Sequence, residues 1–309
     1  MKISIIGAGN VGASLCYELA IRKLCSQIAL VDIFENVAKG KAMDISQACM
    51  GSDNFSCLIA SKNYEDIKDS DIVVITAGSP RKPGMSRSDL LLKNASITKE
   101  IAKNIALYAP NSISIEVANP LDAMTYVVLK QSGFDRKKVL GMAGVLDSSR
   151  MGYHILNQLD FTPKKIDSLV IGSHNDKMLP LARFARVDGK CLNEFISDEK
   201  INQIIQKTKE GGAKIVSLLN TSAYYAPAYS VALMIEAIVN DSKAILPCCV
   251  MLDGEYGYKD VTCGVPVKLG RDGVLEIEEL NLDAKERSEF ELSVDSVKSL
   301  LEVLREHSY

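Results

Sequence analysis

Metal-binding motifs, disulfide motifs and an excess of positive charge are all missing from this sequence of 309 residues. Its eight cysteines form no Cys-x-x-Cys pair, and its histidines (His154, His174 and His307) share no metal-ligand spacing with them. We therefore expect reduced, buried thiols, no disulfide framework and no bound metal. The net charge of −3 argues against nucleic-acid binding, for which a basic domain would be expected.

Long hydrophobic segments are also lacking. The apolar start MKISIIGAG resembles a short signal peptide, but glycines interrupt it at once and Glu18 and Arg22 follow, so a first strand fits better. The later segment AYYAPAYSVALMIEAIV contains Pro227 and Glu236 and is too interrupted to span a bilayer. These patterns predict a soluble, cytoplasmic protein that does not bind membranes.

The two halves of the chain differ in their periodicity. In the first half, short β-rich segments such as KISII, IALVD and DIVVITA alternate with helical patterns, which predicts βαβ units in a doubly wound parallel sheet. The second half has long helical patterns over 197–218 and 222–240, a hairpin signature with GRDG at its tip, and a closing amphipathic helix over 283–305. We predict an α/β domain over 1–143 and an α+β domain over 144–309.

A glycine-rich turn follows the first predicted strand and opens the first helix. It has the pattern G-x-G-x-x-G, made by Gly7, Ala8, Gly9, Asn10, Val11 and Gly12. In this context the glycines permit a tight turn, close approach of a pyrophosphate and close helix–strand packing, as in Rossmann-type domains. Asp32 ends the second strand, where a carboxylate would bind a ribose 2′-hydroxyl and repel a 2′-phosphate. The sequence therefore predicts binding of NAD rather than NADP.

Three polar groups lie where predicted strands end or helices begin. They are Asn119 in VANPLDAMTY, Asp147 with Arg150 in GVLDSSRMG, and His174 in VIGSHND. Each has an ordinary structural explanation when taken alone, such as a turn-forming Asn or a surface ion pair. Beside an NAD site they suit hydride transfer, in which a histidine exchanges the hydroxyl proton and an arginine binds a carboxylate.

The segment GSPRKPGMSRSD, residues 78 to 89, carries three cations before its first acid. Its prolines and glycines keep it out of regular structure. One interpretation is a solvated surface loop; the other is a loop that closes over an anion.

Taken together, these motifs resemble the lactate/malate dehydrogenase family, most closely its lactate-dehydrogenase-like malate dehydrogenases. The resemblance extends over nearly the whole chain, through GAGNVG, Asp32, PRKPGMSR, VANPLDAMTY, GVLDSSR, GSHND and SAYYAPA. It implies a Rossmann-type doubly wound sheet followed by a catalytic α+β domain. It also implies reversible NAD-dependent oxidation of (S)-malate to oxaloacetate in the tricarboxylic acid cycle, by a homodimer or homotetramer.

The resemblance also implies roles for individual residues. His174 is then the proton acceptor and donor, Asp147 its carboxylate partner, and Arg150 the ligand of the substrate carboxylate at the reacting end. Arg87 polarises the substrate carbonyl from a mobile loop. Asn119 contacts both nicotinamide and substrate.

Two further positions complete the NAD site by the same resemblance, namely Asn94 and the backbone of Val117. Arg81 stands where lactate dehydrogenases carry a neutral glutamine, and an arginine there would bind the second carboxylate of a dicarboxylate substrate. On this interpretation, the loop over residues 78–89 closes over a dianion.

Other functions remain open at this point. A lactate dehydrogenase or a promiscuous 2-hydroxyacid dehydrogenase is the nearest alternative, and Arg81 counts against it. A non-catalytic NAD-binding sensor is another alternative. It would not need Asp147, His174, Arg87 and Arg150, so the presence of all four counts against it. An NAD-dependent glycosidase would need a Cys/His metal site. The sequence departs from the family pattern at Ser173 and Asn175, which flank His174, and in the short segment 219–223.

Overall fold

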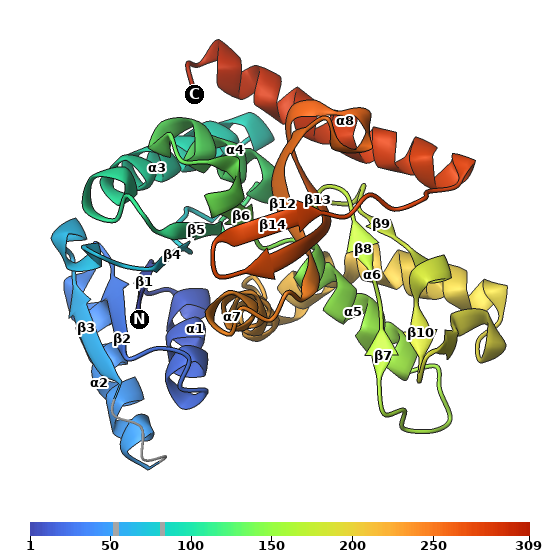
Figure 1. Cartoon of the computed structure of the whole chain (residues 1–309), viewed down its shortest axis with the longest axis horizontal. Coiled ribbons are helices and arrows are strands. Elements are labelled where there is room, and N and C mark those ends of the chain that lie inside the picture. The colour runs from blue at the N-terminus through green and yellow to red at the C-terminus, as the bar shows by residue number, and fades with distance from the viewer. Residues whose placement is uncertain (52–55, 81–83) are drawn as a thin grey trace.

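The computed structural model describes residues 1–51, 56–80 and 84–309. Six parallel strands form one half of its main sheet, in the order β3-β2-β1-β4-β5-β6 (Figure 1). Their bounds are β1 (Lys2–Ile6), β2 (Gln27–Val31), β3 (Cys57–Ser61), β4 (Ile72–Ile75), β5 (Ile113–Glu116) and β6 (Val139–Gly141). Strand order reverses between β1 and β4, so the carboxyl ends of these strands form the edge where such sheets bind ligands.

Helices cover both faces of this parallel sheet. They are α1 (Asn10–Ile21), α2 (Glu35–Met50), α3 (Arg87–Tyr108) and α4 (Leu121–Ser132). One hydrophobic cluster includes residues of α1 and α2, and a second lies where α3 and α4 pack on β4 and β6. The predicted doubly wound α/β fold is therefore confirmed.

The second half of the chain extends the same sheet. Antiparallel strands β12 (Ile245–Asp253), β13 (Lys259–Gly270) and β14 (Gly273–Ile277) add to the edge beyond β6, which gives nine strands in all. The two halves of the sheet meet at one pair of residues, Cys249 of β12 and Gly141 of β6. A Cβ atom on Gly141 would lie 2.4 Å from Thr125 Oγ1 and 3.0 Å from the Cys249 side chain, so only glycine fits there. The predicted domain boundary thus lies within a continuous sheet, and it stays a prediction.

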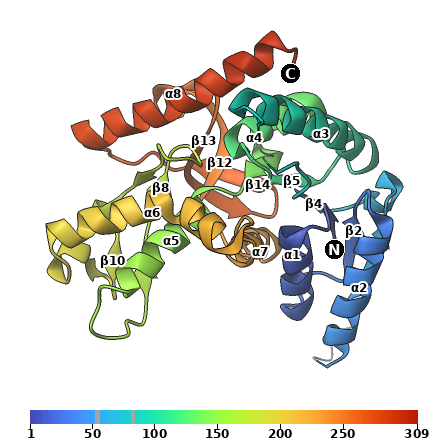
Figure 2. The same cartoon turned by 180° about the vertical axis from the view of Figure 1, so that it is seen from behind.

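The remaining helices and short strands lie beside the antiparallel half of this sheet (Figure 2). The helices are α5 (Gly144–Leu156), α6 (Asp198–Leu219), α7 (Tyr225–Val239) and α8 (Ala284–Glu306). The short strands are β7 (Ile166–Asp167), β8 (Val170–Ile171), β9 (Leu179–Pro180), β10 (Arg186–Val187) and β11 (Lys190–Cys191). The 3₁₀ turns are η1 (Tyr64–Ile67), η2 (Arg136–Lys138), η3 (Ala182–Phe184), η4 (Leu192–Glu194) and η5 (Glu255–Gly257). The predicted strand IDSLVIGSH is divided: β7 pairs with β10, and β8 pairs with β9.

Within the described ranges, no helix is both long and apolar enough to cross a membrane. All eight cysteines are free thiols, and six of them are buried. Over the same residues, no group of three or more His, Cys, Asp or Glu side chains is arranged to hold a metal ion.

Glu116 buries a carboxyl group at the carboxyl end of β5. Its Oε1 accepts hydrogen bonds from the N–H groups of Val117 and Ala118 at 2.9 and 2.6 Å, whereas its Oε2 has no partner among the described residues. Burial raises the pKa of Glu116 to about 8, although the two N–H groups act in the opposite direction. Glu116 therefore keeps its proton in the folded chain at a pH where the unfolded chain has lost it.

We expect Glu116→Gln to stabilise the fold at high pH. Because the folded pKa is raised, the stability that Glu116 confers is complete below about pH 4.5 and is lost as the pH rises through 8. Glutamine carries no charge at any pH, so Tm should rise by roughly 5 °C at pH 8.5 and change little at pH 4.5. Thermal unfolding followed by circular dichroism at both pH values measures this. The same change at exposed Glu302 is the control, and equal Tm shifts at both pH values would contradict the prediction.

Candidate functional site

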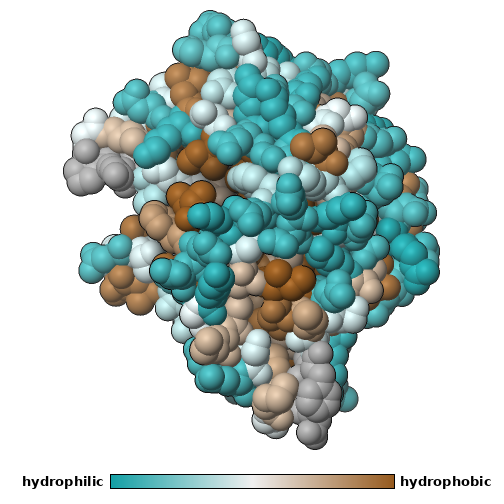
Figure 3. All heavy atoms as spheres, turned by 90° about the vertical axis from the view of Figure 1, so that its left-hand side faces the viewer, coloured by the Kyte–Doolittle hydropathy of each residue, from teal (hydrophilic) through white to brown (hydrophobic). Residues whose placement is uncertain are grey.

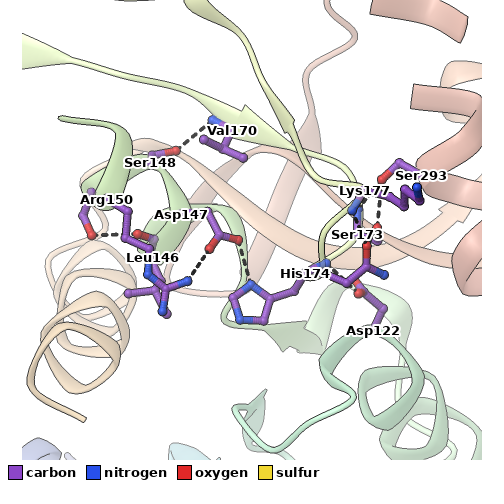
Figure 4. A network of polar contacts seen from close by, with 12 residues as sticks. Asp122, Leu146, Asp147, Ser148, Arg150, Val170, Ser173, His174, Lys177 and Ser293 are labelled. Atoms are coloured by element: carbon purple, nitrogen blue, oxygen red, sulfur yellow. Dashed lines mark hydrogen bonds and ion pairs between the residues drawn. The ribbon is translucent and has the colours of Figure 1, made fainter. Parts of the chain in front are cut away.

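A histidine, an aspartate and an arginine from two elements form one connected group, which we call the His174 cluster (Figure 4). His174 Nδ1 lies 2.7 Å from Asp147 Oδ2. Arg150 Nη1 donates to the other carboxylate oxygen, Asp147 Oδ1, at 2.9 Å. The spacing of Asp147 and Arg150 on one helical face predicted that they would be neighbours, and the structure brings both to His174.

Helix α5 and strand β8 place these side chains. Asp147 lies in the first turn of α5, and His174 follows β8 by three residues. Ser148 Oγ accepts a hydrogen bond from Val170 N at 2.9 Å, which joins α5 to β8. At the start of the helix, a Cβ atom on Gly144 would lie 2.5 Å from Val170 O, so glycine permits this close approach. The separation between carboxylate and imidazole is therefore set by two rigid elements.

The electrostatics of the cluster favour a protonated His174. Burial lowers the pKa of His174, but the charge of Asp147 and its hydrogen bond to the ring outweigh this effect, so the pKa is raised. The Asp147 side chain is only 2% exposed, which keeps water from screening the pair. Because Asp147 occupies Nδ1, the second ring nitrogen, Nε2, is the atom that can exchange a proton with a ligand.

Arg150 has room and unused donors for an anion. Its Nε is buried without a hydrogen-bond partner in the described structure, and its side chain is 14% exposed. Gly211 and Gly212 of α6 face it: a Cβ atom on Gly211 would lie 3.3 Å from Arg150 Cδ. Two glycines within a helix cost stability, and here they let the guanidinium lie close to α6. A planar guanidinium with free N–H groups can bind a carboxylate bidentately.

Asp122 is a residue of this site that the sequence analysis did not identify. It lies in the first turn of α4, and its Oδ2 accepts a hydrogen bond from the backbone N–H of His174 at 2.8 Å. The available signal was the Asp of NPLD, three residues after Asn119. An acid at a helix N-terminus is ordinarily explained by the helix dipole, so the motif alone gave no reason to connect it with His174.

The glycine-rich turn has the geometry of a phosphate-binding loop. Gly7 has φ +111°, and a Cβ atom on Gly12 would lie 1.9 Å from Gly7 O. Asp32 Oδ2 accepts a hydrogen bond from Ala8 N at 2.6 Å, and Lys41 Nζ donates to Ala8 O at 2.7 Å. A carboxylate has about four lone pairs, so Asp32 retains acceptor capacity for a ribose hydroxyl. Lys41 is a second residue that the sequence analysis missed.

The other predicted residues of the turn lie at its open side. Gly9 and Asn10 are exposed, Val11 is half-buried, and α1 begins at Asn10 with its N–H groups pointing toward the turn. A ligand phosphate can therefore reach the helix N-terminus.

Asn94 of α3 connects the ends of two neighbouring strands. Its Oδ1 accepts from Ser79 N at 2.8 Å, and its Nδ2 donates to Asn119 O at 2.7 Å. Val117 is buried and its N–H donates to Ile75 O, while Asn119 is exposed at the edge of the sheet. Asn94 thus fixes the backbone conformation of the segment that carries Asn119.

Within the described residues, no hydrogen bond or ion pair joins Arg87 to the His174 cluster. Arg87 is the first residue of α3, it is exposed, and it directly follows the capping residue Ser86. Arg81 lies outside the described residues.

Comparisons with known proteins agree with this geometry. Residues 1–141 match the family model described as lactate/malate dehydrogenase, NAD binding domain, and residues 144–307 match the alpha/beta C-terminal domain of the same family. The chain is 50% identical over 309 residues to a malate dehydrogenase of Sulfurimonas denitrificans, covering 100% of this chain and 97% of that protein. Over the same length it is 48% identical to a malate dehydrogenase of Nitratiruptor, again covering 100% and 97%.

Solved structures of both activities in the family are similar to this chain. A malate dehydrogenase of Cryptosporidium parvum has a TM-score of 0.95 at 40% identity, covering 99% of each chain. A lactate dehydrogenase of the same organism, solved with lactic acid and nicotinamide adenine dinucleotide, has a TM-score of 0.94 at 36% identity, covering 98% of each. The backbone fold therefore does not separate the two activities.

Proposed function

The chain belongs to the lactate/malate dehydrogenase family, and from that premise we propose that it is an NAD-dependent malate dehydrogenase. The observation that carries the chemistry is the hydrogen-bonded cluster of His174, Asp147 and Arg150 beside a ligand-binding sheet edge. The malate dehydrogenases that match the full chain at 48–50% identity support the substrate.

The residues of the turn fit NAD. Gly7 and Gly12 let the turn pack tightly, since a Cβ atom on either would collide with Thr76 Oγ1 or Gly7 O, whereas no atom lies within 4 Å of a Cβ atom built on Gly9. Asp32 directly follows β2, where the adenosine ribose of a dinucleotide would lie. When bound, NAD supplies or accepts the hydride that reduction and oxidation of the substrate require. We propose that the cofactor is held by Gly7, Ala8, Gly9, Asn10, Val11, Gly12, Asp32, Asn94, Val117 and Asn119.

Proton transfer is the task of His174. In the direction of reduction, protonated Nε2 donates a hydrogen bond to the ketone oxygen of oxaloacetate and gives its proton to the developing alkoxide. In the direction of oxidation, neutral Nε2 accepts the hydroxyl proton of malate. Asp147 stabilises the imidazolium that is present before reduction and after oxidation, and it fixes the ring orientation. Arg150 binds the carboxylate beside the reacting carbon.

Two arginines from the loop region complete the proposed substrate site. We propose that Arg87 polarises the ketone and that Arg81 binds the second carboxylate of the substrate. An unpaired arginine facing the methyl group of pyruvate would be penalised, whereas oxaloacetate supplies its counter-charge. The proposal for Arg81 depends on its position in the sequence motif.

The direct test is NADH oxidation followed at 340 nm with oxaloacetate and with pyruvate in parallel, and with NADPH as the cofactor control. We expect a large preference for oxaloacetate with NADH. A preference for pyruvate would identify a lactate or promiscuous 2-hydroxyacid dehydrogenase. NADH binding without turnover of either substrate would support the non-catalytic sensor.

We further propose that the chain forms a homodimer or homotetramer. Three adjoining helices, α2, α1 and α7, expose large apolar side chains, and Figure 3 shows apolar residues among polar ones on the side that carries α2. The exposed residues are Tyr17, Val37, Met43, Met50, Tyr225 and Tyr229. A hollow of about 570 Å³ lies between these helices. Exposed apolar side chains gathered on adjoining helices are typical of subunit interfaces.

Introducing a charge on this surface tests the interface. Met43 is 64% exposed, and we expect Met43→Arg to shift the mass in light scattering toward the monomer value of 33.7 kDa. The reason is that burying an unpaired arginine in an apolar interface is costly. The matched control is Leu292→Arg on α8, where the side chain is 60% exposed. Equal masses for the wild type and Met43→Arg would reject these helices as the interface.

We propose that the enzyme works in the cytoplasm, in the tricarboxylic acid cycle. The free state of all eight cysteines is what a reducing compartment maintains. Cell fractionation followed by immunodetection tests the location.

A further inference from the structure

Asp122 connects the NAD-binding half of the chain to the proton-transfer histidine. Its carboxyl group is buried, with Oδ2 accepting from His174 N at 2.8 Å and Oδ1 unpartnered among the described residues. Thr262 Oγ1 of β13 donates to the Asp122 carbonyl oxygen at 2.7 Å, which fixes the backbone of Asp122 from a third element. The same helical turn begins just after Asn119, so one short segment reaches both the sheet edge and His174.

Charged or titratable side chains from several packed elements surround the contact between Asp122 and His174. Around His174 they are Asp147 and Arg150 of α5 and Asp122 of α4. Around Asp122 they are His174 together with the buried thiols Cys249 of β12 and Cys263 of β13. Figure 4 shows His174 between Asp147 and Asp122. Arg150 thus supplies a positive side chain that opposes protonation of His174.

The directions in which Asp122 and His174 shift each other's pKa support an electrostatic interaction between their side chains. Burial raises the pKa of Asp122, and the hydrogen bond from His174 N, the His174 charge and the Cys249 thiol offset this only in part, so the pKa stays above its usual value. Reciprocally, the charge of Asp122 raises the pKa of His174. Protonation of the imidazole and ionisation of Asp122 therefore favour each other, as in other coupled pairs.

We propose that Asp122 is a positioning residue for proton transfer: it fixes the backbone of His174 and, as a carboxylate, holds the imidazole proton together with Asp147. This inference rests on the proposed function, because it concerns the same histidine. It adds a second carboxylate to the histidine–aspartate pair. It also gives the buried acid at the junction of the two sheet halves a role that a neutral residue could not fill, namely stabilisation of the imidazolium.

Replacing Asp122 by asparagine removes the negative charge of the side chain but keeps its place beside the His174 backbone, so the two effects can be tested separately. Asparagine has nearly the same shape, and its carbonyl oxygen can still accept the hydrogen bond from His174 N. The loss of charge should lower the pKa of His174 by about one unit. Oxaloacetate reduction requires protonated His174, so its kcat/KM should fall about tenfold at pH values above the pKa. Malate oxidation requires neutral His174, so its activity should extend about one pH unit lower.

The first measurement is a nuclear magnetic resonance titration of the imidazole resonances. The chain has only three histidines, so His154→Gln and His307→Gln variants assign the His174 resonance without any turnover. The matched control is Glu116→Gln, which removes a different fully buried carboxyl group and should leave the His174 titration unchanged. An unshifted His174 titration in Asp122→Asn would overturn the inference.

The second measurement is the pH profile of both reaction directions. A merely structural role for Asp122 would lower oxidation and reduction together at every pH, and that result also overturns the inference. Asp122→Ala, which removes the hydrogen bond as well, should lower kcat in both directions in addition to shifting the profiles. A wild-type chain that binds NADH and turns over no substrate would instead contradict the proposed function, while the imidazole titration would still test Asp122.

A measurement on the wild-type chain covers the case in which Asp122→Asn does not fold. With aspartate labelled with carbon-13 at Cγ, the Asp147 carboxyl resonance is assigned by Asp147→Asn. We expect a second buried carboxyl resonance to shift at the pH where the His174 ring titrates. A response confined to Asp147 would mean that Asp122 does not sense the imidazole charge.

Discussion

Asparagine in place of His174 should reduce kcat about a thousandfold in both directions, while the dissociation constant for NADH changes little. The reduction follows because asparagine cannot donate and accept the proton, and general acid–base catalysis by one side chain contributes between about 10² and 10⁴ in rate. Cofactor affinity is spared because His174 lies in the second half of the chain, away from the glycine-rich turn. Steady-state rates at 340 nm and a fluorescence titration with NADH measure the two quantities separately.

His154 provides the matched control for this change. It lies on α5, the helix that carries Asp147, and it is half-buried. His154→Asn should therefore leave kcat within about a factor of two, as is usual for a substitution remote from the chemistry. If His174→Asn retained most of the wild-type kcat, the assignment of proton transfer to His174 would be wrong, whatever the NADH affinity.

Glutamine in place of Arg81 should lower kcat/KM for oxaloacetate by roughly 10⁴-fold while sparing that for pyruvate. A site that has lost a required polar partner discriminates by about this factor, because the distal carboxylate of oxaloacetate is then buried without a counter-charge. Pyruvate has a methyl group at that position and loses nothing when the arginine is removed. Parallel assays of both substrates with NADH give the ratio of the two kcat/KM values.

The neighbouring cation Lys82 distinguishes a specific contact from general attraction of an anion. Lys82→Gln removes the same charge from the same loop, and we expect the preference for oxaloacetate to persist. An equal loss of preference in both variants would indicate that the loop acts only through its net charge. Unchanged turnover of oxaloacetate by Arg81→Gln would show that another residue binds the second carboxylate.

Local patterns were sufficient for the parts of this protein that depend on neighbours in the chain. The alternation of β-rich and helical segments gave the doubly wound sheet, because side-chain periodicity follows directly from the backbone geometry of each element. The glycine-rich turn could be identified because backbone sterics within six residues require glycine at Gly7 and Gly12. Asp147 and Arg150 could be paired because their spacing places them on one helical face.

Contacts between distant segments could not be obtained in this way. Asp122 and His174 are 52 residues apart, and nothing in either local sequence specifies the other. The resemblance assigns Asn94 to the cofactor site, but only the structure shows that its amide is hydrogen-bonded to the backbone at the ends of two strands. The division of IDSLVIGSH between two small sheets depends on the partners β9 and β10, which lie farther along the chain.

The sequence by itself determined the class of fold, the glycine-rich turn and the side chains that we propose for hydride-coupled proton transfer. Each of these is encoded in periodicity, backbone sterics or residue chemistry over short spans. The tertiary structure alone decided that β12 joins β6 through Gly141, that Asp122 holds the His174 backbone and that Arg150 lies against Gly211. Such contacts depend on packing between segments far apart in the chain, where shape and burial rather than local propensity select the partner.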